Sequence, residues 1–168
     1  EAFLSLDLPG SKVVVGDGPE GPNLKRKFPD AIFLGNKTSA ELAPIYASSD
    51  VFVFPSKTDT FGMVLLEALS SGLPVAAFPI MGPIDVVGAS GAGVLNNDLR
   101  MAALEALTIP RDRARDHALS YTWESCAKQF LDNAAYAHGA VAIGGLGIEA
   151  WINQSDNCVE NSLGSTMA

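Results

Sequence analysis

Two carboxylates and a glycine form the most chemically informative group in this 168-residue chain. Asp59 and Glu67 lie eight positions apart, and Gly62 lies between them where a helix is predicted to begin. The N–H groups of a first helical turn are free, and together with the helix dipole they form a site for an anion such as phosphate. Gly62 would let a phosphate approach the backbone closely.

The two carboxylates are suited to a different part of a ligand. Neither should contact a phosphate, because like charges repel. Both can accept hydrogen bonds from sugar hydroxyls, and a carboxylate can bridge two neighbouring hydroxyl groups. The stretch around Gly62 therefore predicts a diphosphate at the helix terminus with a sugar on each side.

Apolar runs and helical patterns alternate along residues 10–135. The strands and helices that they predict must position Asp59, Gly62 and Glu67. Nearly all-apolar strands that alternate with helices are typical of a parallel sheet covered on both faces. The predicted fold class is α/β, a Rossmann-like three-layer sandwich with a parallel central sheet, whose ligands bind at the carboxyl ends of the strands, in loops 16–22 and 55–62. The predicted strands are 12–16, 31–34, 51–54, 74–78 and 94–95, and the predicted helices are 38–48, 62–71, 98–107, 111–119 and 123–137.

Composition narrows the class of protein. Hydrophobic residues make up 48% and charged residues 18%, as in ordinary globular domains. The net charge of -8 argues against a nucleic-acid or anionic-membrane surface. No apolar run reaches the about 18–20 residues of a membrane span, and the two cysteines lack a metal or redox spacing. We expect a cytoplasmic location, one nucleotide-binding domain over 1–138 that is incomplete at its N-terminus, and an irregular or disordered tail over 139–168.

A series of short motifs indicates a particular family of proteins. In order along about residues 10–135, the chain resembles the retaining glycosyltransferases of the GT-B fold (glycosyltransferase family 4, or group 1). Asp59 and Glu67 occupy the two ends of that family's E-x7-E motif. The other matching segments are Gly16–Pro19, Phe33–Gly35, Tyr46 ahead of Ser49–Ser56, Phe61–Gly62, Leu66–Ala68, Gly72–Val75 and Tyr121–Glu124.

This resemblance assigns a role to each site residue. It implies that Glu67 binds the two ribose hydroxyls of the nucleotide. Asp59 takes the catalytic position, where the family's first Glu contacts hydroxyls of the donor sugar. The remaining positions bind through the backbone or line the site: Phe61, Gly62 and Met63 toward the diphosphate, Gly16 and Gly18 on the base side, and Gly35 and Asn36 near the base edge.

The implied reaction is the transfer of a hexose from a nucleoside-diphosphate sugar with retention of configuration, and with no metal or other cofactor. The sequence departs from the family pattern at two points that bear on this reaction. Asp59 is one methylene shorter than Glu, which reduces its reach by about 1.5 Å. The segment Glu1–Ser11 holds no Arg or Lys, although the family's diphosphate clamp lies upstream of Gly16. We therefore expect this chain to lack the clamp and the N-terminal acceptor domain, and to be inactive alone.

Three other functions remain open. A glycosidase could use Asp59 and Glu67 as paired carboxylates, but a retaining enzyme needs them roughly 5–5.5 Å apart around a sugar rather than around a phosphate site. A nucleotide-sugar epimerase can share the fold, although we find none of its usual acid and base residues. The chain could also be a nucleotide-binding fragment without catalysis. Lys57 could face a phosphate, but such loop lysines are more often solvated.

Overall fold

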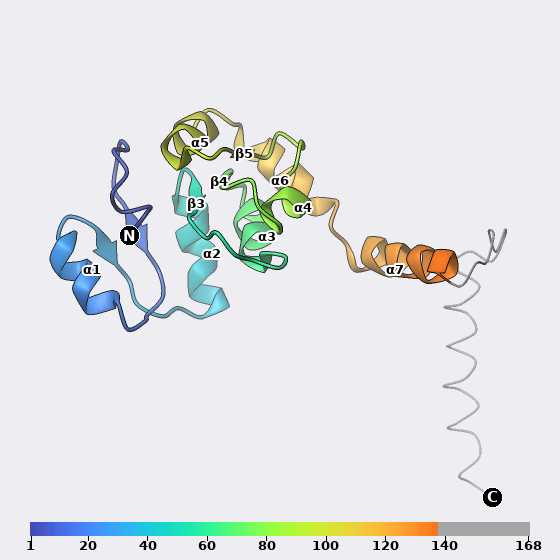
Figure 1. Ribbon diagram of the computed structural model, residues 1–168, viewed down its shortest axis with the longest axis horizontal. Coiled ribbons are helices and arrows are strands. Elements are labelled where there is room, and N and C mark those ends of the chain that lie inside the picture. The colour runs from blue at the N-terminus through green and yellow to red at the C-terminus, as the bar shows by residue number, and fades with distance from the viewer. Residues whose placement is uncertain (138–168) are drawn as a thin grey trace, which may run out of the picture. The chain divides into compact units, whose positions relative to one another are not determined.

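The computed structural model describes residues 1–137, in which parallel strands alternate with helices (Figure 1). The chain divides into two compact units, Glu1–Ser120 and a second that begins at Tyr121. The expected tail over 139–168 lies outside the described residues. The elements are β1 (Val13–Val14), α1 (Gly21–Lys27), β2 (Ile32–Phe33), α2 (Ser39–Ser48), β3 (Phe52–Phe54), α3 (Met63–Ser70), β4 (Val75–Ala77), α4 (Pro83–Val86), β5 (Gly93–Leu95), α5 (Leu99–Ala106), α6 (Arg111–Leu119) and α7 (Trp123–Ala137).

The strands form two parallel sheets. β1 pairs with β2, and β4 lies between β3 and β5 in a separate three-stranded sheet. Figure 1 shows β1 beside β2 in blue, apart from the sheet that holds β3, β4 and β5. The parallel, Rossmann-like class is confirmed. Among the described strands the parallel pairing falls into two sheets, because β1 and β3 are not paired with each other.

Helices cover β4 on both faces and produce the three predicted layers. Val75 and Ala77 point into a cluster with residues of α3, α4 and α6, among them Leu65 and Leu69. The intervening Ala76 points to the opposite face. There it packs against the alanines of α5, Ala102, Ala103 and Ala106. All three residues of β4 are fully buried, so this strand is the centre of the hydrophobic core.

Local capping signals explain where several helices begin. Thr38 and Glu41 form the predicted capping box, in which the Glu41 carboxylate accepts the Thr38 N–H at 2.9 Å. Asp98 caps α5 by accepting two backbone N–H groups of its first turn. Neither α1 nor α4 was predicted from the sequence. Both are short, and the proline in the first turn of each was the available signal.

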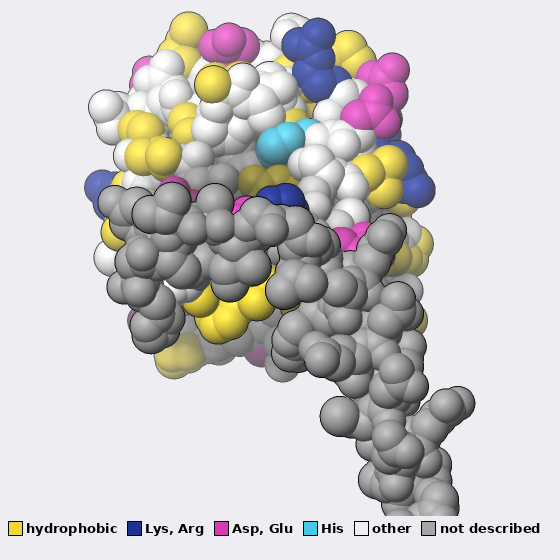
Figure 2. Space-filling view, turned by 90° about the vertical axis from the view of Figure 1, so that its right-hand side faces the viewer, with side chains coloured by type: hydrophobic (Ala, Val, Ile, Leu, Met, Phe, Trp, Pro, Cys, Tyr) yellow, Lys and Arg dark blue, Asp and Glu magenta, His cyan; other side chains and the backbone are white. Residues whose placement is uncertain are grey.

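The second unit is described through α7. Thr122 is the predicted N-cap, and its hydroxyl accepts the Ser125 N–H at 3.0 Å. Trp123 and Phe130 are 89% and 71% exposed on this helix. Among residues 1–137, no helix is long and apolar enough to cross a membrane. On the face shown in Figure 2, Lys and Arg side chains are scattered among hydrophobic and acidic ones.

Candidate functional site

The start of α3 is built around the conformation of Gly62. This residue is the N-cap, with a φ of 80° in the left-handed region. A Cβ at this position would lie 2.8 Å from Cδ1 of Leu65, whose side chain is fully buried. Glycine is therefore required both for the backbone conformation and for the space.

Asp59 organises the loop that leads into this turn. Its Oδ1 accepts the backbone N–H of Phe61 at 3.1 Å. Of the three N–H groups expected to face a diphosphate, the one of Phe61 is thus engaged by Asp59. Met63 begins the helix, and the N–H of a first-turn residue has no partner within its own helix. The side chains of Phe61 and Met63 are exposed by 39% and 63%.

Glu67 is exposed on α3, and Tyr46 of α2 contacts its carboxylate. The Tyr46 hydroxyl donates a hydrogen bond to Oε2 of Glu67 at 3.5 Å. The ring of Tyr46 meets Phe52 edge-on, with 5.7 Å between the ring centroids. Burial of the Tyr46 phenol, reinforced by the negative charge of Glu67, raises the pKa of Tyr46 above its ordinary value. Tyr46 was not among the predicted site residues, although its place in the ordered family motif was a signal that could have identified it.

The loops after β1 and β2 are joined to each other. The Gly16 N–H donates to the Gly35 carbonyl at 2.8 Å. Asp17 and Asn36 exchange two hydrogen bonds, in which each side chain accepts the other's backbone N–H at 3.1 Å. The structure therefore brings together Gly16, Gly35 and Asn36, which are three of the four residues predicted to surround the base. Asp17, which the prediction did not include, holds this arrangement in place.

Gly18, the fourth residue predicted near the base, lies in the same loop but has a different local role. Its carbonyl accepts the Gly21 N–H at 2.9 Å, where α1 begins. This turn ends the loop after β1.

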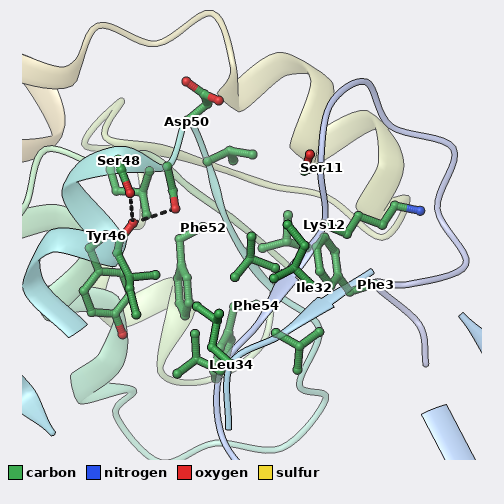
Figure 3. Close-up of a pocket in the computed structure, with 18 of the residues that line it drawn as sticks. Phe3, Ser11, Lys12, Ile32, Leu34, Tyr46, Ser48, Asp50, Phe52 and Phe54 are labelled. Carbon is green, nitrogen blue, oxygen red and sulfur yellow. Dashed lines mark hydrogen bonds between the residues drawn. The ribbon is translucent and has the colours of Figure 1, made fainter. Parts of the chain in front are cut away.

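One cavity of about 990 Å³ connects part of the predicted site (Figure 3). Gly16, Asn36, Tyr46 and Glu67 all line it. These residues come from the carboxyl ends of β1 and β2 and from the two helices that flank β3, as expected of ligand loops in a parallel sheet. The other predicted residues are not part of this lining: Asp59, Phe61, Gly62, Met63, Gly18 and Gly35.

Other polar groups near the sheet have structural contacts. The Lys57 ammonium lies 5.5 Å from the centroid of the Phe78 ring, a cation–π contact. His117 places Nε2 2.7 Å from the Val86 carbonyl oxygen. Within the part of the chain that the structure describes, no group of three or more His, Cys, Asp or Glu side chains could hold a metal ion.

The parallel strands, the joined loops at their carboxyl ends and the glycine-started helix place the chain in the Rossmann-like class. Solved structures with this fold agree. The TarM structure matches with a TM-score of 0.61 at 20% identity, covering 75% of this chain and 29% of TarM. WaaG, a glycosyltransferase involved in lipopolysaccharide biosynthesis, matches with a TM-score of 0.60 at 21% identity, over 86% of this chain and 42% of WaaG. An Anabaena protein solved with UDP and glucose gives 0.59 at 17% identity, over 80% and 43% of the two chains.

Residues 10–109 match the family described as glycosyl transferases group 1, and the chain belongs to that family. A sulfoquinovosyl transferase of Arabidopsis thaliana is 36% identical over 147 residues, which cover 77% of this chain and 29% of that protein. A GDP-mannose-dependent alpha-mannosyltransferase of Corynebacterium glutamicum is 45% identical over 83 residues, covering 49% of this chain and 20% of that protein. The chain thus spans less than a third of either relative.

Proposed function

We propose that this chain is the donor-binding domain of a retaining glycosyltransferase, and that it binds a nucleoside-diphosphate sugar whose hexose the longer protein transfers. The observation that carries the proposal is the position of Glu67. Its carboxylate lies on the same cavity as Gly16 and Asn36, at the carboxyl edge of the sheets. We further propose that the reaction requires no metal and takes place in the cytoplasm.

Glu67 can hold the ribose because its carboxylate has spare acceptor capacity. Tyr46 contacts Oε2, whereas an ionised carboxylate offers about four acceptor positions. Two neighbouring ribose hydroxyls can therefore donate to the same group.

The first turn of α3 supplies the electrostatic part of the mechanism. Backbone N–H groups at Gly62 and Met63 would donate to the diphosphate, whose charge increases as the sugar leaves. Donors fixed in advance by the turn at Gly62 stabilise that charge without reorganising. Asp59 would contact the transferred sugar while it supports the loop through the Phe61 N–H.

The relatives do not determine the base. One similar structure holds UDP, whereas one similar enzyme is named as dependent on GDP-mannose. Calorimetric titration of the chain with UDP, GDP and ADP is the direct test of nucleotide binding. We expect saturable binding of at least one of the three, and binding of none would refute the proposal.

Glu67→Ala distinguishes the assigned role from a general effect of lost charge. Loss of hydrogen bonds to a charged acceptor costs about 1.5–3 kcal/mol, so affinity for the free diphosphate should fall roughly 10- to 150-fold. Glu105→Ala, which removes an exposed carboxylate from α5, is the matched control and should leave affinity unchanged.

Asp59→Asn tests the assignment of the second carboxylate. This change keeps an oxygen that can accept the Phe61 N–H, and it should weaken only the sugar nucleotide because Asp59 is assigned to the transferred sugar. If Asp59→Asn and Glu67→Ala weakened the free nucleotide equally, the role assignment would be wrong.

Sugar transfer itself is proposed for the longer protein. Catalysis needs an acceptor held against the donor, and such alignment is worth about 7–11 kcal/mol of the barrier. The relatives extend well beyond the part that this chain matches. We expect no turnover when the chain alone is incubated with labelled sugar nucleotides and sugar acceptors. Turnover that saturates with donor and is lost in Glu67→Ala would contradict this expectation.

A further inference from the structure

The Tyr46 hydroxyl lies beside the carboxylate to which the ribose is assigned, and both side chains line the same cavity. We propose that Tyr46 is a specificity-determining residue of the donor site, whose hydroxyl donates a hydrogen bond to one of the two ribose hydroxyls that donate to Glu67. The site then selects nucleotides that keep this hydroxyl over their deoxy counterparts. This inference rests on the proposed function and adds a second residue to the ribose site.

Glu67 alone can satisfy only half of a ribose hydroxyl. A hydroxyl group carries one hydrogen to donate and also lone pairs that accept, whereas an ionised carboxylate only accepts. The ribose hydroxyl that donates to Glu67 therefore loses water from its acceptor side when the nucleotide binds. An acceptor that loses water without gaining a donor opposes binding. A donor beside the carboxylate removes this cost, and the phenol of Tyr46 carries the required hydrogen.

The distance between the two side chains leaves room for a shared ribose hydroxyl. The Tyr46 hydroxyl oxygen lies 3.5 Å from Oε2 of Glu67, whereas an ordinary O–H···O bond is about 2.7–2.8 Å long. The phenol hydrogen is thus only loosely engaged by the carboxylate. A ribose oxygen about 2.8 Å from both atoms completes a triangle on this 3.5 Å side. Such an oxygen donates to Glu67 and accepts from Tyr46 at the same time.

The ring of Tyr46 is positioned by β3. The residue is half-buried, and its ring meets Phe52 edge-on with 5.7 Å between the centroids. Figure 3 shows the Tyr46 hydroxyl turned away from Asp50 and toward the end of the cavity where Phe54 lies. Because Asp50 precedes β3 and Phe54 ends it, the hydroxyl is directed to the carboxyl end of the strand. Ligands of parallel sheets bind at that end.

Two serines close to Tyr46 in the sequence use their hydroxyls differently. Ser48 and Ser49 each donate a hydrogen bond to the Ile45 carbonyl, at 3.1 and 2.8 Å. Both serines line the cavity, but their hydroxyl hydrogens are engaged by the backbone of the same helix. Ser48→Ala is therefore a matched control for Tyr46→Phe, because it removes a hydroxyl from the same helix and the same cavity.

Calorimetric titration of the intact chain with UDP, GDP and ADP, each compared with its 2′-deoxy and 3′-deoxy counterparts, tests the assignment. In the unaltered chain both deoxy counterparts should bind more weakly than the parent diphosphate, because each loses a hydrogen bond to Glu67. Tyr46→Phe keeps the ring that contacts Phe52. It should weaken the parent diphosphate roughly 2- to 12-fold, the effect of one neutral hydrogen bond. It should weaken one deoxy counterpart by the same factor and leave the other unchanged, because the latter lacks the hydroxyl to which Tyr46 donates.

The three nucleotides are compared within one variant, so a lower fraction of folded chain reduces all three affinities equally and cancels. Ser48→Ala should leave every affinity unchanged. If Tyr46→Phe weakened the parent and both deoxy counterparts equally, Tyr46 would act through packing or through Glu67, and the proposal would be overturned. An unchanged affinity for the parent diphosphate would overturn it as well. In both cases the donor site would stand, whereas failure of the unaltered chain to bind any of the three diphosphates would refute the donor site and this inference together.

Discussion

Replacement of Gly62 by alanine should destabilise the chain through two separable effects. The left-handed backbone at φ 80° costs a residue with a Cβ about 1–2 kcal/mol. The new Cβ would lie 2.8 Å from Cδ1 and 3.1 Å from Cγ of Leu65, and this fully buried side chain has little freedom to move. Overpacking of this kind costs about 1–3 kcal/mol. The reduced entropy of the unfolded chain offsets about 0.4–1 kcal/mol, so a net loss of about 1–4.5 kcal/mol is expected.

Gly10→Ala is a matched control for the backbone effect. Gly10 has a φ of 81°, and a Cβ there would meet no atom within 4 Å. This variant should lose no more than about 1.5 kcal/mol, so the difference between the two variants measures the contact with Leu65. Urea unfolding followed by circular dichroism should show a lower midpoint with an unchanged slope. If the two variants differed by less than about 0.5 kcal/mol, Leu65 would not restrict the position of Gly62, and our account of the α3 terminus would be wrong.

Three further outcomes are expected. Titration of the phenolate absorbance should show Tyr46 ionising above the ordinary tyrosine pKa. Glu67→Gln should lower the pKa of Tyr46, and an unchanged pKa in this variant would mean that the two side chains do not meet. Because the raised pKa belongs to the folded state, stability should fall as the pH rises from the unfolded value through the folded one. Asp98→Ala removes the α5 cap and should lower the free energy of unfolding by about 1 kcal/mol, whereas Asp98→Asn should retain most of it. Arg111→Lys should cost about 1.5–3 kcal/mol in thermal or urea unfolding, because its guanidinium donates to three backbone carbonyls that a lysine cannot all reach; a loss below 0.5 kcal/mol would refute this.

The sequence predicted the long elements well because their signals are local. The helices at 39–48, 111–119 and 123–137 agree closely with the structure, and apolar periodicity or capping residues marked each one. The short helices α1 and α4 have too few turns to show a periodic apolar face. The separation of the strands into two sheets could not be predicted, because strand pairing depends on residues far apart in the sequence.

Only the part of the candidate site that depends on local sequence was predicted. The turn at Gly62 and the carboxylate of Glu67 are local features of one strand–loop–helix segment. The contact between Tyr46 and Glu67 joins residues 21 positions apart, and the bonds between Asp17 and Asn36 span 19 positions. No local pattern indicated either contact. The ligand roles of Asp59, Glu67 and the loop glycines stay predictions until nucleotide binding is measured.

The alanine-lined face of β4 limits how this domain can change over evolution. Ala76 meets Ala102, Ala103 and Ala106, and all four side chains are fully buried. Side chains this small let α5 lie close to the sheet, and none of them can shrink to make room for a larger neighbour without becoming glycine. A gain of volume at one position would therefore move the whole helix. The opposite face combines leucines and valines with four alanines, and its larger side chains can exchange volume between neighbours, so related sequences should vary more freely there than on the side of α5.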